Sequence, residues 1–404
     1  MIPFAYRCTD CGRTYPRERV RYLCPACGAG YRPGVPLPGV LEVVQDSAAI
    51  TRAFDPSRPD LGLFCPVEPE YHPCFPVGNT PLIRVDRLGH RFGLDSLWVK
   101  NDGMNPSGSL KDRASFLVVA EAIRLEERRI VAASTGNAAT ALAAVCASTD
   151  REALIFVPAS APRAKLVQML VHGARVVPVR GSYDDAFRLS LEYTEQRGGL
   201  NRNTAYHPLT IEGKKTVGLE IWQQLGMQVP DAVVVPVGDG VILAGVHKAF
   251  VDLQRAGLAE RLPRLVCVQA ETSDAIDRFI RTGRYADAPA PRTRADSLSV
   301  ACPSNARWAR RAVEQSGGLS LVVSDAEILA AQQLLARTTG IFAEPAAAAA
   351  LAGLERLQAG PGRFGAAERV VLLVTGHGLK DVEAPLSRIS LPDPIEPTLD
   401  AFKE

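Results

Sequence analysis

The stretch IVAASTGNAATALAAVCASTDREALIFV, residues 130–157, decides the fold class of this chain. It begins with a short apolar run, Ile130–Ala133, passes through a small polar loop into the alanine-rich stretch Ala138–Thr149, and ends in a second apolar run, Ala153–Val157. The two short runs predict buried strands, and the longer stretch between them predicts a helix. A strand, a crossover helix and a second strand form the repeating unit of a parallel sheet that helices cover on both faces.

The same alternation extends from about residue 80 to the end of the last apolar run, so the body of the chain is predicted to be α/β. The further strands predicted are Leu97–Lys100, Arg175–Val179, Ala232–Pro236, Arg264–Ala270 and Val370–Thr375. The further helices predicted are Ser109–Glu127, Pro162–Val171, Tyr183–Arg197, Leu243–Ala256, Asp325–Thr338 and Pro345–Leu357.

The composition of the chain excludes some classes of function. The chain has 404 residues, of which 47% are hydrophobic, and its formal net charge is +2. These values predict two or three globular domains, and the small net charge argues against a dedicated nucleic-acid binder. The longest apolar run, near Ala346–Gly353, is far shorter than the roughly 20 residues that span a bilayer. The N-terminus shows no signal-peptide pattern, so we expect no membrane partner, reduced thiols and a cytoplasmic location.

Four cysteines near the N-terminus form two pairs with the same internal spacing. Cys8 and Cys11 form the first pair, Cys24 and Cys27 form the second, and 12 residues separate the pairs. Two tight turns of this kind aim four thiolates at one point, and a closed tetrahedral set of thiolates suits Zn²⁺. The spacing therefore predicts a small zinc ribbon with a structural metal site. A rubredoxin-like iron site and four unliganded cysteines are the alternatives.

Residues 33–76 carry many prolines, which predicts an extended connector that lies over the following domain.

Two loops in the first half of the α/β body have an unusual composition. The loop Asn105–Arg113 places Lys111 in the first turn of a helix, where the helix field and desolvation lower an amine's pKa and favour a nucleophile or base. In isolation the same pattern also fits a solvated surface lysine. The loop Ser134–Asn137 presents hydroxyls and amides at a helix N-terminus, which suits a carboxylate. A simple helix cap by Asn137 is its alternative.

Two further loops follow strands in the second half. Gly238-Asp239-Gly240-Val241-Ile242 is a short glycine loop of the kind whose backbone amides hold a phosphate, although Asp239 is unexpected there. Thr375 follows the last strand and places one hydroxyl at its carboxyl end. In open α/β sheets, loops at the carboxyl ends of strands form the ligand site.

Together, the four loops resemble those of the fold type II pyridoxal-phosphate enzymes, a superfamily that includes the tryptophan synthase β-chain, and within it the threonine synthases. The resemblance runs from Gly78 to Asp381. It is densest in five stretches: Asn105–Arg113, Ala133–Asn137, Tyr206–Thr216, Phe342–Ala346 and Thr375–Asp381. Some members of this family also carry an N-terminal zinc ribbon.

The resemblance implies a fold of two three-layer α/β/α domains with the cofactor in the cleft between them. The implied divisions are a zinc ribbon over residues 1–35, a connector over 36–75, a large cofactor-binding domain from 76–104 and 206–390, a small α/β domain over 105–205, and a tail over 391–404. A homodimer that acts on a small amino acid is the implied assembly.

Roles for individual residues also follow from the resemblance. Lys111 is expected to form the Schiff base with pyridoxal phosphate and then to act as the base at the substrate α-carbon. Gly238, Asp239, Gly240, Val241 and Ile242 are expected to hold the cofactor phosphate, Asn137 its ring oxygen, and Thr375 its pyridine nitrogen. Ser134, Thr135 and Asn137 are expected to bind the substrate carboxylate.

The implied reaction is that of a lyase that converts O-phospho-L-homoserine and water to L-threonine and phosphate. Some family positions that favour a substrate phosphate differ here: Ala138, Ala205 and Thr210 stand where hydroxyl or basic residues often occur. Lys214, Lys215, Arg163 and Arg113 are candidates to compensate. The alternatives are a related β-elimination or β-replacement enzyme for another amino acid, such as a serine or threonine dehydratase, and a non-catalytic zinc-ribbon binding protein.

Overall fold

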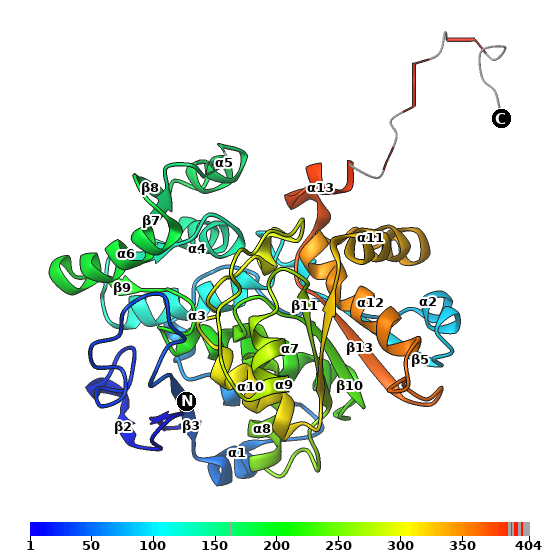
Figure 1. The fold of residues 1–404 in the computed structure, drawn as a ribbon. Coiled ribbons are helices and arrows are strands. Elements are labelled where there is room, and N and C mark those ends of the chain that lie inside the picture. Colours follow the sequence, from blue (N-terminus) through cyan, green and yellow to red (C-terminus); the bar gives the residue numbers. More distant parts are fainter. Residues whose placement is uncertain (162, 387–388, 390–391, 395–396, 399–404) are drawn as a thin grey trace.

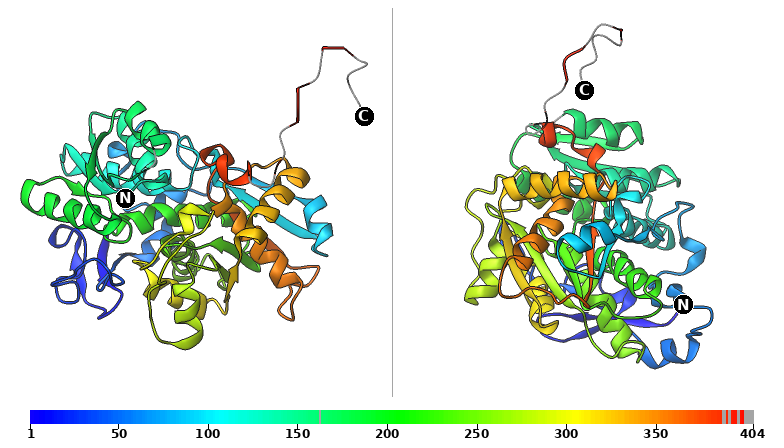
Figure 2. Two further views of the ribbon diagram at one scale, coloured as in Figure 1. Left: turned by 45° about the horizontal axis from the view of Figure 1, so that its top comes forward. Right: turned by 90° about the vertical axis from the view of Figure 1, so that its right-hand side faces the viewer.

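The computed structural model describes residues 1–161, 163–386, 389, 392–394 and 397–398. Two parallel sheets form the body of the molecule, and a small antiparallel sheet lies beside them at the N-terminus (Figures 1 and 2). The predicted α/β class is confirmed. Among the described helices, none is long and apolar enough to cross a membrane.

The larger sheet has six strands in the order β12-β11-β10-β13-β5-β4. All neighbours in it are parallel except β4, which runs antiparallel to β5. Its strands are β4 (Leu82–Arg84), β5 (Ser96–Asn101), β10 (Ala232–Pro236), β11 (Arg264–Ala270), β12 (Leu319–Val323) and β13 (Arg369–Val374).

Helices cover both faces of the six-stranded sheet because successive side chains of a strand point to opposite faces. Val234 and Val266 pack into one apolar core with α2 (Asp86–Arg91), α11 (Asp325–Thr339) and α12 (Pro345–Gln358). Val233 and Leu265 pack into the opposite core with α7 (Leu209–Gln224), α8 (Val241–Arg255), α9 (Ala275–Thr282) and α10 (Ala306–Gln315).

The smaller parallel sheet has four strands in the order β8-β7-β6-β9. These are β6 (Arg129–Ala133), β7 (Glu152–Pro158), β8 (Arg175–Val179) and β9 (Leu200–Asn201). One face packs on α3 (Lys111–Arg124), α4 (Asn137–Ala147) and α5 (Arg163–Val171), and the other face packs on α6 (Tyr183–Arg197). The stretch of residues 130–157 therefore forms β6, α4 and β7.

The N-terminal sheet has the order β2-β1-β3, with β1 (Phe4–Cys8), β2 (Thr14–Pro16) and β3 (Leu41–Gln45). Strand β3 and helix α1 (Ser47–Ala53) fall inside the segment predicted as an extended connector, so that prediction is wrong there. The alternating run Leu41–Gln45 pairs with β1 and buries Leu41 and Val43. The remaining short helical turns are η1 (Arg17–Arg19), η2 (Leu61–Phe64), η3 (Pro69–Tyr71), η4 (Asp102–Met104), η5 (Asp296–Leu298), η6 (Gly378–Lys380) and α13 (Glu383–Leu386).

The predicted strands and helices lie within a few residues of the observed ones. Helix α7 was missed because most of its residues are buried, so it lacks the amphipathic period that marks a surface helix. Strands β4, β9 and β12 and helices α2, α9 and α10 were also missed. Pro162, at the predicted start of α5, and most of the predicted tail 391–404 lie outside the described residues.

Candidate active site

Loops from both parallel sheets meet at a cavity of about 580 Å³. The carboxyl ends of β6, β10 and β13 open toward it, which is where ligands bind in open α/β sheets. The cavity brings together every residue that the sequence predicted for cofactor or substrate: Lys111, Ser134, Thr135, Asn137, Gly238, Asp239, Gly240, Val241, Ile242 and Thr375.

Three helices begin at this cavity. Helix α3 begins at Lys111, α4 at Asn137 and α8 at Val241. The first backbone amides of a helix lack partners within it and carry partial positive charge, so three converging N-termini favour anionic groups. Gly240, the residue before α8, has a φ of +86°, and a Cβ there would lie 3.0 Å from the Asn305 carbonyl oxygen. The positive φ and this close approach require glycine at the turn.

The loop before Lys111 is held in place by its own polar contacts. Ser107 donates from its backbone N to Asp112 Oδ2 at 2.7 Å, and its hydroxyl also donates to the Asp112 carboxylate. The Leu110 amide donates to the Thr375 carbonyl oxygen at 2.9 Å, which joins the lysine loop to the end of β13. Lys111 and Thr375 are thus fixed relative to each other by the backbone.

Burial lowers the pKa of Lys111, and the nearby Arg202 and Lys380 cations act in the same direction. The Glu344 carboxylate opposes them, because a negative charge favours the ammonium form. Desolvation, one of the two causes that the sequence suggested, is therefore the main cause of the shift. A lysine with a lowered pKa has more of the neutral amine that attacks a carbonyl carbon.

Asn137 has a partner that the sequence reasoning missed. Its Nδ2 donates to Glu344 Oε2 at 2.9 Å and to Oε1 at 3.1 Å. Glu344 is buried, and burial raises the pKa of its carboxyl. Its carboxylate occupies the space beside Gly376, where a Cβ would lie 2.3 Å from Glu344 Oε1. Glu344 stands inside the stretch Phe342–Ala346 that carries the resemblance, but no role was predicted for it.

Two buried cations line the cavity close to Lys111. Arg202 follows β9 and donates from Nε to Ser115 Oγ at 3.2 Å, and its Nη2 has no hydrogen-bond partner among the described residues. Lys214 lies on α7, and its Nζ is 3.5 Å from Thr204 Oγ1. Across the part of the chain that the structure describes, neither cation forms an ion pair with a carboxylate within 4.0 Å. Burial lowers the pKa of both, to about 10 for Arg202.

The carboxylate of Asp239 contacts a neighbouring backbone amide. Its Oδ1 accepts a hydrogen bond from the Ser304 amide at 2.5 Å. Burial raises its pKa, and the Lys214 cation opposes that shift. The main chain of Gly238–Ile242 remains available to an anion, as the sequence suggested.

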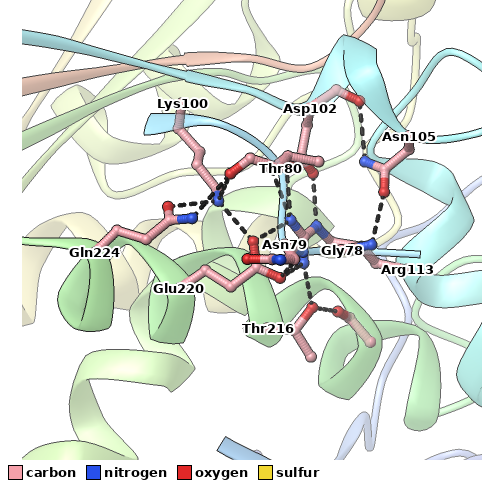
Figure 3. A network of polar contacts seen from close by, with 11 residues as sticks. Gly78, Asn79, Thr80, Lys100, Asp102, Asn105, Arg113, Thr216, Glu220 and Gln224 are labelled. Atoms are coloured by element: carbon pink, nitrogen blue, oxygen red, sulfur yellow. Dashed lines mark hydrogen bonds and ion pairs between the residues drawn. The ribbon is translucent and has the colours of Figure 1, made fainter. Parts of the chain in front are cut away.

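The other candidate anion contacts are engaged elsewhere. Arg113 donates to Asp102 Oδ2 at 2.7 Å and to Glu220 Oε1 at 2.6 Å, and Lys100 also binds Glu220 at 2.6 Å (Figure 3). This buried network joins α3 to β5 and α7, so Arg113 positions the helix of Lys111 and is not free to bind a ligand. Lys215 pairs with Glu212 and Asp252. The side chain of Arg163 lies outside the described residues.

The sequence departs from the family pattern at Ala138, Ala205, Thr210 and Asp239, and of these Ala138 and Asp239 reach the cavity. Ala138 lines it and offers no hydroxyl. The Thr210 hydroxyl is buried and donates to the His207 carbonyl oxygen at 2.8 Å, and Ala205 is buried in an apolar cluster with Trp308. Arg202 and Lys214 line the same cavity as Ala138.

The four N-terminal cysteines form one cluster. Their Sγ atoms all lie within 4.8 Å of one another, and those of Cys11 and Cys24 are 3.8 Å apart. Tetrahedral Zn–S bonds of about 2.3 Å place sulfurs roughly 3.8 Å apart, so the geometry fits a Cys₄ zinc site. The amides of Asp10 and Cys11 lie within hydrogen-bond distance of Cys8 Sγ. All nine cysteines are free thiols.

Residues 74–376 match the model of the family described as pyridoxal-phosphate dependent enzyme. The chain belongs to this family. The residues of the cavity fit the cofactor: a lysine of lowered pKa, a glycine turn at the N-terminus of α8 for the phosphate, and a hydroxyl at Thr375. Membership in this family favours an enzyme over a non-catalytic binding protein.

Particular relatives narrow the comparison. The chain is 36% identical to the threonine synthase of Methanosarcina acetivorans over 98% of this chain and 97% of that protein. It is 34% identical to the threonine synthase of Methanocaldococcus jannaschii, with 98% of each chain covered. Among solved structures, the T.th. threonine deaminase matches with a TM-score of 0.63 at 28% identity, over 74% of this chain and 92% of that chain.

Proposed function

We propose that this protein is a pyridoxal-phosphate-dependent threonine synthase, which converts O-phospho-L-homoserine and water to L-threonine and phosphate. The observation that carries the proposal is the pair of buried cations, Arg202 and Lys214, on the wall of the cavity that contains Lys111. A buried cation without a carboxylate partner is costly unless a ligand supplies the counter-charge. The cavity therefore favours an amino acid with a second anionic group. The likeness to two threonine synthases along nearly the whole chain supports the same substrate.

When bound, pyridoxal phosphate supplies an electron-withdrawing ring that stabilises negative charge on the carbon skeleton of the substrate. Lys111 would hold the cofactor covalently and then move the proton at the substrate α-carbon through its Nζ. The amides of Gly238–Ile242 would bind the cofactor phosphate, and the Thr375 hydroxyl would meet the ring nitrogen. A hydroxyl at that nitrogen does not enforce its protonation, which suits elimination and replacement chemistry.

The substrate is oriented at both of its ends. Ser134, Thr135 and Asn137 would bind its carboxylate at the N-terminus of α4, with Glu344 holding the Asn137 amide in position. Arg202 and Lys214 would bind its phosphate and stabilise the negative charge that develops on the leaving oxygen. Such charge-assisted hydrogen bonds are about twice as strong as neutral ones, so they add both affinity and direction.

A second candidate function is β-elimination or β-replacement on a different amino acid. Ala138 favours it, because the cavity lacks a hydroxyl at that position for a substrate phosphate. In that case Arg202 and Lys214 would bind another anionic side group.

The deciding experiment measures phosphate release from O-phospho-L-homoserine by the cofactor-loaded protein, with the amino-acid product identified by mass. L-serine, L-threonine and O-phospho-L-serine serve as parallel substrates. Release of phosphate together with threonine supports the threonine synthase. Absence of turnover with this substrate, accompanied by ammonia release from serine or threonine, would establish the second candidate instead.

The proposal includes three finer properties. The Cys8, Cys11, Cys24 and Cys27 cluster would hold one structural Zn²⁺, because four thiolates leave no open coordination position. Light scattering in solution should give the mass of a homodimer, the assembly expected of the family. A cytoplasmic location agrees with nine cysteines that form no disulfide, since a reducing compartment keeps them reduced.

A further inference from the structure

The segment between the second cysteine pair and β3 reaches the active-site cavity. It stands far from Lys111 in the sequence, yet it forms the side of the cavity that faces α6 and the loop before α10. The N-terminal segment is drawn in blue in Figure 1. The cavity residues from this segment are Tyr31, Pro33, Gly34 and Val35, and the same cavity is lined by Tyr183, Asp184 and Phe187 of α6 and by Cys302 and Ser304 of the loop before α10.

The segment between Gly28 and Gly39, which contains this loop, contacts the cysteine cluster at both of its ends. At its start, the Tyr31 amide donates to the Gly28 carbonyl oxygen at 3.1 Å, directly after the second cysteine pair. At its end, the Cys24 amide donates to the Gly39 carbonyl oxygen at 2.8 Å. A Cβ on Gly39 would lie 2.9 Å from Cys24 Cβ and 3.0 Å from Cys27 Cβ, so the backbone touches the metal ligands there. A change in the cluster must therefore move the loop.

The loop is also bonded to the phosphate-binding turn. The Leu37 amide donates to the Ser304 carbonyl oxygen at 2.9 Å, and the Ser304 amide donates to Asp239 Oδ1 at 2.5 Å. Asp10, inside the first cysteine pair, accepts from the Gly39 amide at 2.7 Å and from Arg307 of α10 at 2.9 Å. Asp239, which is unexpected in a phosphate loop, thus connects that loop to the N-terminal ribbon through one residue.

On its other side the ribbon contacts the smaller parallel sheet. Tyr31 packs in an apolar cluster with Phe156 and Phe187. Tyr22 accepts a hydrogen bond from the Asn201 amide at 3.0 Å and stacks on Tyr206 with ring centroids 4.7 Å apart. The ribbon therefore bridges the two sheets that flank the cavity, and its loop lies where they meet.

We propose that the N-terminal ribbon is a specificity-determining part of the active site. Its loop Tyr31–Val35 forms the outer wall of the substrate pocket, and the cysteine cluster holds the segment that contains this loop at both ends. The loop limits the size of the bound side group and restricts access to Lys111. The inference rests on the proposed function through the substrate of the first experiment below, and through the cofactor bond of Lys111 and the Zn²⁺ of the cysteine cluster in the second.

The first experiment introduces a larger side chain at a loop position that lines the pocket. Val35 is 53% exposed and lines the cavity, so Val35→Trp adds bulk there without disturbing a core. We expect the KM for O-phospho-L-homoserine to rise about tenfold, with the absorbance of the bound cofactor unchanged. Arg32→Trp is the matched control, because Arg32 is a neighbour in the sequence that does not line the cavity, and it should leave KM unchanged.

The second experiment needs no substrate. Borohydride reduces the imine between Lys111 and the cofactor to an amine, with hydride added to carbon and a proton from water added to nitrogen, and the visible absorbance is lost. We expect Cys27→Ala, which removes one metal ligand, to raise the rate of this loss several-fold. Cys74→Ala, which changes an exposed thiol outside the cluster, should not. Zinc content and thermal unfolding are measured alongside to show that the two-sheet body remains folded.

The outcomes separate the two proposals. Wild-type reduction rates in a folded, zinc-free Cys27→Ala protein, together with an unchanged KM in Val35→Trp, would overturn the role of the ribbon. A protein that does not turn over O-phospho-L-homoserine but loses its protection from borohydride in Cys27→Ala would contradict the proposed substrate and support the ribbon wall.

Discussion

Replacement of Arg202 by Met should change stability and substrate binding in opposite directions. Arg202 is buried, binds one hydroxyl through Nε and has an unpartnered Nη2. Burial lowers its pKa from 12.5 to about 10, so the folded protein disfavours its charged form. Because both pKa values lie above pH 7, the full difference between them applies at neutral pH and corresponds to about 3 kcal/mol.

Methionine keeps most of the volume of the side chain and removes the charge. Loss of the hydrogen bond to Ser115 costs about 1 kcal/mol. The net expectation for Arg202→Met, measured without ligand at pH 7, is an increase of about 2 kcal/mol in the free energy of unfolding. Chemical denaturation followed by circular dichroism measures it. As the pH rises above 10, arginine can lose its charge in the folded state, so the advantage of methionine should shrink.

The same substitution should weaken the binding of the substrate. If Arg202 holds the substrate phosphate, its loss removes charge-assisted hydrogen bonds of about 1.5–3 kcal/mol, which raises the KM for O-phospho-L-homoserine roughly 10- to 150-fold. Arg175→Met is the matched control, because Arg175 is exposed on β8, and neither quantity should change. A variant that is less stable than the wild type and retains its KM would refute the assignment, since that pattern indicates a structural arginine.

Three further predictions concern the lysine, the buried network and the packing beneath it. Lys111→Ala should abolish the cofactor's visible absorbance band while the protein stays folded, and retention of the band would exclude the lysine assignment. Burial alone would raise the pKa of Glu220, but hydrogen bonds from Arg113 and the charge of Lys100 outweigh it and hold the pKa at about 2. The stabilisation from this pairing is therefore complete above the ordinary pKa of 4.5 and is lost as the pH falls toward 2, so Glu220→Gln should flatten the acid limb of a stability-against-pH curve. Gly213→Ala should destabilise the fold by several kcal/mol in urea unfolding, because its Cβ would lie 2.3 Å from the Arg113 carbonyl oxygen, and a near-neutral result would mean that α3 and α7 can separate.

Much of the architecture was predictable because local sequence patterns indicate many of its strands and helices. Short apolar runs bounded by glycine, proline and polar residues predicted β10 and β11 with their observed bounds, since a strand buried on both faces needs a continuous apolar run. The bounds of β8 were also predicted, although it is an edge strand whose side chains are half-buried or exposed. Two of the missed elements lie in sequence that does not indicate them. Helix α7 is buried over most of its surface and has no polar stripe, and β3 follows a proline-rich run that suggests an extended connector.

The sequence by itself predicted four unusual loops and two cysteine pairs, and the resemblance of the loops to a known family predicted their roles toward the cofactor. Within each loop and each cysteine pair the residues are only a few positions apart, so a turn or a helix start fixes their local placement without the rest of the molecule. Tertiary structure alone decided the electrostatics of the pocket. In the folded chain, Arg113 belongs to a buried network of ion pairs, and Asn137 donates a hydrogen bond to Glu344. Arg202 and Lys214 lie on the cavity wall. It also brought the loop after Cys27 against the active site, because contacts and desolvation between distant segments depend on the packing of the two sheets and leave no local pattern in the chain.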